Sequence, residues 1–121
     1  MSDPFSSLSA AERELLEPAP RPDKVTPMKA LLTDDRFSDP GWIYERKLDG
    51  IRCIAIKAQT QVRLLSRNDL SLNGRFGEVA DALEADSATD FVLDGEVVAF
   101  DGPQTSFARL QQRGERPVSV F

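Results

Sequence analysis

The hydrophobic pattern of the chain is clearest in its middle, where two short stretches rich in apolar residues divide into two faces of alternate positions. One runs from Ile51 to Ala58 and the other from Val62 to Ser66. An alternation with a period of two is typical of β-strands. Because only residues 59–61 separate the two stretches, we predict that they form an antiparallel hairpin.

A helical pattern and a further strand follow the hairpin. Four apolar residues spaced i, i+3, i+4 and i+7 predict a helix over about 75–85, and they are Phe76, Val79, Ala80 and Leu83. The run from Phe91 to Phe100 predicts a second strong strand. Asp94 and Glu96 share one of its faces with apolar residues. Because a buried carboxylate is costly without a partner, this face is either the wet side of an edge strand or has a chemical role.

The two ends of the chain give shorter predictions. Ser9 to Glu12 has the form of a capping box, which predicts one or two helical turns before Pro18. Residues 42–44 are predicted to open a strand that delivers Lys47 to its end. A short helix is predicted over 106–113 and the start of another strand over 117–121. Together the elements predict an α+β fold of antiparallel β-strands with flanking helices.

The predicted domain organisation is simple. A length of 121 residues fits one domain or a piece of one. Residues 1–23 contain prolines at 18, 20 and 22 and little apolar surface, so we predict a flexible N-terminal segment there. Residues 24–121 are predicted to hold the fold.

Composition excludes several classes of site. The chain has no histidine and a single cysteine, Cys53, which excludes an internal disulfide and a histidine-based triad or zinc site. The net charge of −5 argues against a simple nucleic-acid-binding patch as the whole function. No apolar run is long enough to cross a membrane, and no signal peptide is visible at the N-terminus. These features predict a cytoplasmic protein without a membrane partner.

The stretch from Tyr44 to Arg52 concentrates charge beside the first predicted strand. Asp49-Gly50 predicts a tight turn, because glycine accepts positive φ and aspartate bonds its own backbone. Lys47 then lies at the lip of that turn. Taken alone, a Lys-x-Asp-Gly stretch is equally well explained as a solvated turn with incidental charge pairs.

Three segments in register resemble the covalent nucleotidyltransferases, which comprise ATP-dependent DNA ligases, RNA ligases and capping enzymes. Residues 47–52 (KLDGIR) match the nucleophile motif, residues 66–68 (SRN) resemble the second motif, and residues 94–96 (DGE) the third. Within the superfamily, residues 42–50 and 106–111 most resemble bacterial ATP-dependent DNA ligases of the end-joining ligase D type. The resemblance covers roughly 24–121.

The resemblance implies a role for each candidate residue. Lys47 is the expected nucleophile for ATP, and Glu45 stands where an adenine-contacting acidic residue often lies. Glu96 is expected to contact the ribose and to help organise Mg²⁺ or Mn²⁺. Arg52 and Arg67 are expected to contact ribose, phosphate or DNA, as their fixed donor forks suit phosphate oxygens. Asp94 matches the frame of the motif, and no chemistry is assigned to it.

The resemblance also implies partners and an extent. The parent enzyme is expected to bind ATP and to seal nicks in double-stranded DNA during repair, with end-joining proteins as partners. Later family motifs and the OB-fold domain do not occur within the 121 residues, so the chain is expected to be the N-terminal part of an adenylation domain, monomeric and inactive on its own. An RNA ligase, or a non-catalytic module that binds a nucleotide or a partner, are the alternatives.

Overall fold

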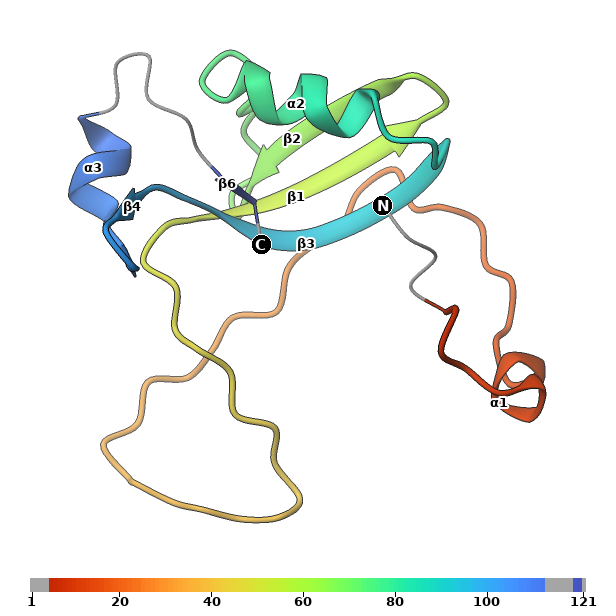
Figure 1. Ribbon diagram of the computed structural model, residues 1–121, viewed down its shortest axis with the longest axis horizontal. Helices are drawn as coiled ribbons and strands as arrows, with labels where there is room; N and C mark the ends of the chain where they lie inside the picture. Colours follow the sequence, from red (N-terminus) through yellow and green to blue (C-terminus); the bar gives the residue numbers. More distant parts are fainter. Residues whose placement is uncertain (1–4, 113–118, 121) are drawn as a thin grey trace.

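The hairpin predicted from the alternating pattern lies at the centre of the fold (Figure 1). The structure is a computed structural model that describes residues 5–112 and 119–120. Strand β1 (Ile51–Ala58) pairs antiparallel with β2 (Gln61–Ser66), from Cys53 opposite Ser66 to Ala58 opposite Gln61. The connecting turn contains Gln59 at a φ of 56°.

Two further strands extend the sheet on the other side of β1. Strand β3 (Asp90–Val98) runs antiparallel to β1 along its whole length, and β6 (Ser119–Val120) pairs with the last two residues of β3. The strand order is β2-β1-β3-β6. A separate small ladder joins β4 (Phe100–Asp101) to β5 (Gln104–Thr105). The prediction of antiparallel strands with flanking helices is confirmed.

Helix α2 (Gly77–Glu84) covers one face of the sheet and closes the main core (Figure 1). Its apolar stripe packs on the inward side chains of β1 and β2, and Leu110 of α3 (Phe107–Gln111) joins the same cluster. The fully buried members include Phe76, Leu64, Val97 and Leu110, each 0% exposed. Burial of this apolar surface is the main stabilising contribution to the fold.

A buried lysine, Lys57, caps the C-terminal end of α2. Lys57 is 1% exposed, and its Nζ donates hydrogen bonds of 2.8–2.9 Å to the carbonyls of Leu83, Glu84 and Asp86. The last carbonyls of a helix have no partner within the helix, and they carry partial negative charge. The three donors of one ammonium group therefore satisfy both the helix end and the buried charge.

The opposite face of the sheet meets an extended segment, residues 21–28, which we call the N-terminal strap. Arg21 bonds Asp90 at 2.5 Å and Lys24 bonds Asp69 at 2.8 Å. The carbonyl of Asp23 accepts a hydrogen bond of 2.6 Å from Arg63. Ile54 and Ile56 on this face of β1 are each 1% exposed. The predicted domain boundary at residue 23 stays a prediction. The strap contacts the sheet through residues before this boundary, such as Arg21, and after it, such as Met28.

Several predicted elements differ in extent. The capping box at Ser9 forms, and α1 (Ala10–Glu14) follows it. The strand predicted up to residue 100 is interrupted between Val98 and Phe100, where β4 begins. The helix predicted over 106–113 ends at Gln111, and residue 113 lies outside the described residues, as does most of the strand predicted over 117–121. No helix within the described part of the chain is long and apolar enough to span a membrane.

The strand predicted at Trp42 is wrong. Residues 42–49 have no regular secondary structure, and Ile43 is 88% exposed. Within the described residues no strand lies beside them, so their backbone groups have no ladder to join. A local aromatic contact forms instead, with the rings of Phe37 and Trp42 5.0 Å apart, edge to face. Residues 29–47 thus form a long excursion away from the sheet (Figure 1).

Candidate functional site

The segment from Glu45 to Gly50, which we call the lysine loop, leads the chain into β1 without forming a helix or strand. The side chain of Lys47 is exposed and makes no hydrogen bond or ion pair with any of residues 5–112. The charge pairs of the alternative explanation, between this lysine and its neighbouring carboxylates, therefore do not form. The Lys47 amine is accessible to a ligand.

Asp49 bonds residues far along the chain and not Lys47. Its backbone N–H donates to Oγ1 of Thr105 at 2.9 Å, and its Oδ2 accepts from the backbone N–H of Phe107 at 3.0 Å. Nη2 of Arg46 donates to the carbonyl of Pro103 at 3.2 Å. The lysine loop is thus tied to the segment between β4 and α3.

Gly50 meets the third motif at the end of the loop. Its N–H donates to Oε1 of Glu96 at 2.8 Å. A Cβ at this position would lie 2.3 Å from the carbonyl oxygen of Val97 and 2.7 Å from Cγ1 of Val98. The prediction of a tight turn with positive φ at this glycine is wrong: residue 50 is a bend, and among the described glycines only Gly102 has a positive φ. Close approach to β3 is what demands glycine here.

Arg52 and Asp94 form a two-pronged ion pair across β1 and β3. Nε and Nη2 of Arg52 donate to the two carboxylate oxygens of Asp94 at 2.5 Å each, and Nη1 donates to the carbonyl of Met28 at 3.4 Å. Asp94 raises the pKa of the Arg52 guanidinium through these hydrogen bonds. β3 lies between β1 and β6, but β6 pairs only with Val97 and Val98, so within the described residues Asp94 and Glu96 lie on a part of β3 without an outer neighbour. The face itself is partly open, since the side chains of Arg52 and Asp94 are 37% and 43% exposed.

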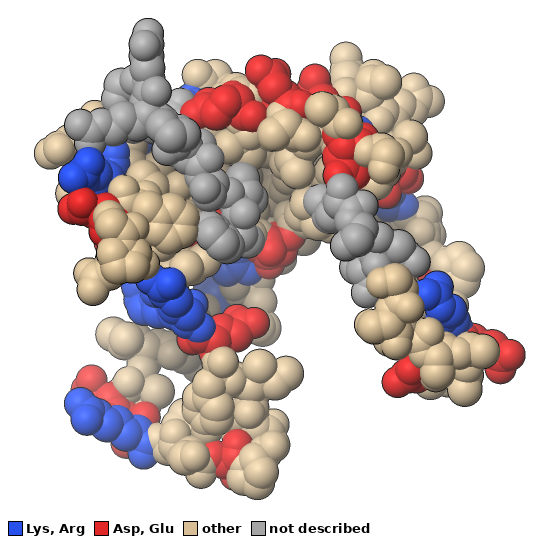
Figure 2. Space-filling model, in the orientation of Figure 1, with Lys and Arg blue, Asp and Glu red and all other residues tan. Residues whose placement is uncertain are grey.

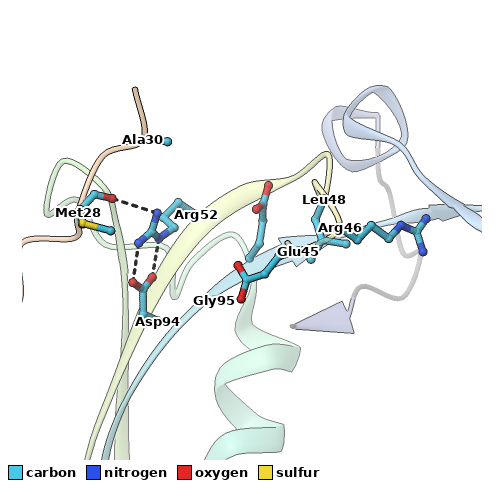
Figure 3. Close-up of a pocket in the computed structure, with 9 residues that line it drawn as sticks. Met28, Ala30, Glu45, Arg46, Leu48, Arg52, Asp94 and Gly95 are labelled. Atoms are coloured by element: carbon cyan, nitrogen blue, oxygen red, sulfur yellow. Dashed lines mark hydrogen bonds and ion pairs between the residues drawn. The ribbon is translucent and has the colours of Figure 1, made fainter. Parts of the chain in front are cut away.

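Two cavities open beside these contacts. The larger has a volume of about 740 Å³ and is lined by nine residues, which are Met28, Ala30, Glu45, Arg46, Leu48, Arg52, Asp94, Gly95 and Glu96. Figure 3 shows Arg52 bound to Asp94 on one side of Glu45 and the guanidinium of Arg46 on the other. The volume lies within the range of ligand pockets, about 300–1,000 Å³.

The second cavity brings in the remaining motif. It has a volume of about 470 Å³ and is lined by Ser66, Arg67 and Asn68 together with Arg52 and Glu96. Oγ of Ser66 accepts hydrogen bonds of 3.2 Å from the backbone N–H groups of Asn68 and Leu70, which shapes the loop after β2. Arg52 and Glu96 line both cavities, so four of the five predicted site residues surround them. Lys47 lines neither, but both of its neighbours in the chain line the first.

Two contacts at this site are not predicted by the motifs. Asp94, to which no chemistry was assigned, holds Arg52, and the backbone of Met28 reaches the same guanidinium. No motif or spacing in the sequence indicates the Arg52–Asp94 pair, because it depends on the register of β1 and β3. Acidic side chains also gather along the top of the molecule in Figure 2, where Figure 1 places α2.

Comparison with known proteins relates the chain to DNA ligases. The family described as "ATP dependent DNA ligase domain" matches residues 24–120. The DNA ligase-like protein LigB of the SPbeta prophage in Bacillus subtilis is 37% identical over 90 residues, covering 74% of this chain and 32% of that protein. The bifunctional non-homologous end joining protein LigD of Bacillus subtilis is 33% identical over 101 residues, covering 77% of this chain and 16% of that protein.

Solved structures give the same relationship. The ligase domain of Mycobacterium tuberculosis LigD superimposes with a TM-score of 0.59 at 32% identity, over 64% of this chain and 26% of that one. A mycobacterial DNA ligase D complexed with ATP and MES gives a TM-score of 0.55 at 35% identity, over 63% of this chain and 25% of that one. The chain spans a third or less of the length of these curated relatives. Since the family match covers most of its residues, this chain belongs to the ATP-dependent DNA ligase domain family.

Proposed function

We propose that this chain supplies the nucleophile-bearing part of an ATP-dependent DNA ligase, in which Lys47 accepts AMP from ATP. The observation that carries the proposal is the meeting of the motif segments around two cavities that share Arg52 and Glu96. The exposed amine of Lys47 lies on the loop that borders the larger cavity. A ligase that binds ATP among the structural relatives supports the choice of nucleotide.

In the proposed reaction the neutral amine of Lys47 attacks the α-phosphorus of ATP. A P–N bond forms, the bond from that phosphorus to the oxygen bridging to the β-phosphate breaks, and pyrophosphate leaves with the electron pair. The amine gives up a proton to water, and a lysine–AMP phosphoramidate remains. The Asp49 carboxylate is bound at Phe107 and makes no ion pair with Lys47.

The other candidate residues are proposed to bind the nucleotide. Glu45 is proposed to contact the adenine and Glu96 the ribose, since both line the larger cavity. Arg52 and Arg67 are proposed to bind phosphate oxygens or DNA from the second cavity, where guanidinium forks suit such oxygens. Because Asp94 already orients Arg52, binding of a phosphate by the remaining N–H groups of its guanidinium would cost little side-chain entropy.

A divalent cation fits these residues only together with the nucleotide. The described residues contain no cluster of three or more side chains that could hold a metal ion. Mg²⁺, however, is usually bound by one or two carboxylates plus substrate phosphates. Glu96 is the proposed protein ligand, because it is the one carboxylate residue that lines both cavities. When bound, Mg²⁺ or Mn²⁺ would neutralise phosphate charge.

The activity of the whole enzyme is a broader proposal. We propose that it seals nicks in double-stranded DNA during repair, and the end-joining role named for one relative makes end joining the favoured context. The isolated chain is proposed to be a monomer with weak, metal-dependent ATP binding and little self-adenylation. Its Lys47 is exposed, whereas stabilisation of a phosphoryl transition state requires groups preorganised in a water-excluded site.

Affinity labelling tests the proposal without requiring full catalytic competence. An adenosine that carries an electrophilic sulfonyl fluoride in place of its phosphates reacts with a lysine that lies beside a bound nucleotide. We expect the reagent to modify Lys47 ahead of the exposed Lys29, and ATP with Mg²⁺ to suppress that modification. Peptide mapping by mass spectrometry identifies the modified lysine.

Two results would count against the proposal. One is equal modification of Lys47 and Lys29, and the other is modification of Lys47 that ATP does not suppress. The Lys47→Arg variant is the matched control, because it keeps the charge but offers no amine of ordinary reactivity. An AMP adduct on Lys47 after incubation with ATP alone would support the nucleophile while showing that the isolated chain is more competent than we expect.

A further inference from the structure

The lysine loop is held by a segment more than fifty residues later in the chain. This segment, residues 103–107, we call the clamp. Its contacts to the loop come from the carbonyl of Pro103, the hydroxyl of Thr105 and the backbone N–H of Phe107. Figure 1 places β4 and α3 at the end of the sheet where the chain enters β1.

The clamp itself is anchored in the core. Leu110 of α3 is 0% exposed within the main hydrophobic cluster. The N–H of Ser106 donates to the carbonyl of Ala99 at 2.8 Å, and Oγ of Ser106 accepts from the N–H of Arg109 at 3.3 Å. Arg109 also bonds Asp101 at 2.9 Å across the small ladder. A contact to the clamp therefore ties the lysine loop to the rigid part of the fold.

Asp49 and Thr105 make the central connection. Asp49 uses its N–H toward Thr105 and its carboxylate toward Phe107, so both its backbone and its side chain are fixed. Lys47 is two residues away, which limits its Cα to about 7 Å from that of Asp49. The preceding residues of the excursion, from 29 to 44, have no regular secondary structure. Lys47 therefore lies between two contacts to the clamp, one from the side chain of Arg46 on its N-terminal side and one from Asp49 on its C-terminal side.

We propose that Asp49 and Thr105 are positioning residues, which hold the lysine loop so that Lys47 stays at the border of the cavity lined by Glu45 and Glu96. This rests on the proposed function of Lys47. Neither Asp49 nor Thr105 lines either cavity, so neither is expected to contact the nucleotide. Their effect is on where the nucleophile lies, and a displacement of about 1 Å can cost on the order of 100-fold in rate.

Thr105→Val tests the proposal, because valine keeps the shape of threonine but cannot accept the hydrogen bond from Asp49. We expect the maximal rate of labelling of Lys47 by the sulfonyl fluoride adenosine to fall about 10- to 100-fold. The concentration of reagent that gives half this rate is expected to change by less than about twofold, since the cavity lining is intact. Thr105→Ser, which restores the hydroxyl, is expected to recover the rate.

The matched control is Thr60→Val, at the exposed turn between β1 and β2, which is expected to leave the rate unchanged. Amide exchange measured by NMR on the same variants reports the geometry directly. In Thr105→Val the Asp49 amide is expected to exchange about tenfold faster, while the Ile54 amide in β1 keeps its protection. The backbone order parameter of Lys47 is expected to fall with it.

The outcomes separate the two proposals. If ATP fails to protect Lys47 in the unaltered chain, the proposed function fails, and the order parameter of Lys47 still decides whether Thr105 fixes the loop. If Thr105→Val leaves the Asp49 amide protected, or releases it without changing the order parameter of Lys47, the positioning role is wrong. A labelling rate that stays at the unaltered value in a variant with a released amide also overturns it.

Discussion

Asp94 holds Arg52 from a diagonal position across two strands. The residue directly opposite Arg52 on β3 is Glu96, and Asp94 lies opposite Ile54. Diagonal neighbours on one face of an antiparallel pair are within reach of long side chains. Glu96 meanwhile accepts from the Gly50 N–H. The two carboxylates of the third motif thus have separate partners in the first motif. These partners, Arg52 and Gly50, both line the second cavity.

The Asp94→Asn substitution is expected to release Arg52 with little loss of stability. The pair is partly exposed, with side-chain exposures of 37% and 43%, and such ion pairs contribute about 0–1 kcal/mol. ATP affinity, measured by NMR titration with Mg²⁺ present, is expected to weaken several-fold because the guanidinium is no longer oriented. Asp90→Asn at the far end of β3, which breaks the Arg21 pair, is the control and is expected to leave ATP affinity unchanged. Equal affinities in the two variants would contradict the orienting role.

Gly50→Ala is expected to be among the more damaging single methyl additions in the chain. The new Cβ would lie 2.3 Å from the Val97 carbonyl oxygen and 3.0 Å from Cγ of Glu96, so β3 or the lysine loop must move. Overpacking of this kind typically costs about 1–3 kcal/mol. Urea unfolding measures the loss, with Gly74→Ala as the control because a Cβ there meets nothing within 4 Å. A loss no larger than that of the control would mean that the close approach relaxes freely.

The hydrophobic pattern of the sequence predicts β1, β2 and α2. The alternation in β1 and β2 and the stripe of α2 give the sheet and its covering helix, because each element buries one face against the other. The strap at Arg21–Met28 has no such pattern. Its own carbonyls accept hydrogen bonds from arginines of β1 and β2, and its Arg21 pairs with Asp90 of β3. The flexibility predicted for residues 1–23 stays a prediction.

The candidate site shows the same division. The motif resemblance selected Glu45, Arg52, Arg67 and Glu96, and these four surround the two cavities. Their partners cannot be predicted from the spacing of residues. The Arg52–Asp94 pair depends on the register of two strands, and the Asp49–Thr105 contact joins residues that are far apart in the chain. Residues 42–44 carry strand-forming side chains, but a strand forms only where a neighbour offers hydrogen bonds.

Lys57→Met is expected to destabilise the fold although it adds apolar surface to a buried position. Methionine resembles the lysine stem but leaves the carbonyls of Leu83, Glu84 and Asp86 without their shared donor. Loss of a donor to buried or half-buried acceptors costs about 1–3 kcal/mol. Urea unfolding of Lys57→Met against Lys29→Met, an exposed lysine, measures the difference. Increased exchange of the amides in the last turn of α2 would locate the effect, and equal stability of the two variants would contradict the capping role.

The last prediction concerns stability at alkaline pH and rests on Cys53. Its side chain is 2% exposed on the core face of β1, and burial raises the pKa of the thiol to about 11 from an ordinary value of 9.0. Above pH 9 the thiol of the unfolded chain loses its proton while the folded thiol keeps it, so the unfolded state binds fewer protons. Stability then decreases as pH rises, because the free energy of unfolding falls wherever the folded state binds more protons.

The effect is expected to be fully absent below about pH 8 and complete above about pH 12, since it develops between the two pKa values. Two pKa units correspond to at most about 2–3 kcal/mol. Lysines and Tyr44 also titrate in this range, so the measurement is the difference in urea unfolding free energy between the unaltered chain and Cys53→Ala at each pH. That difference is expected to shift in favour of Cys53→Ala between pH 9 and 11. A difference that stays constant across this range would mean that the folded thiol ionises as readily as the unfolded one and is open to water.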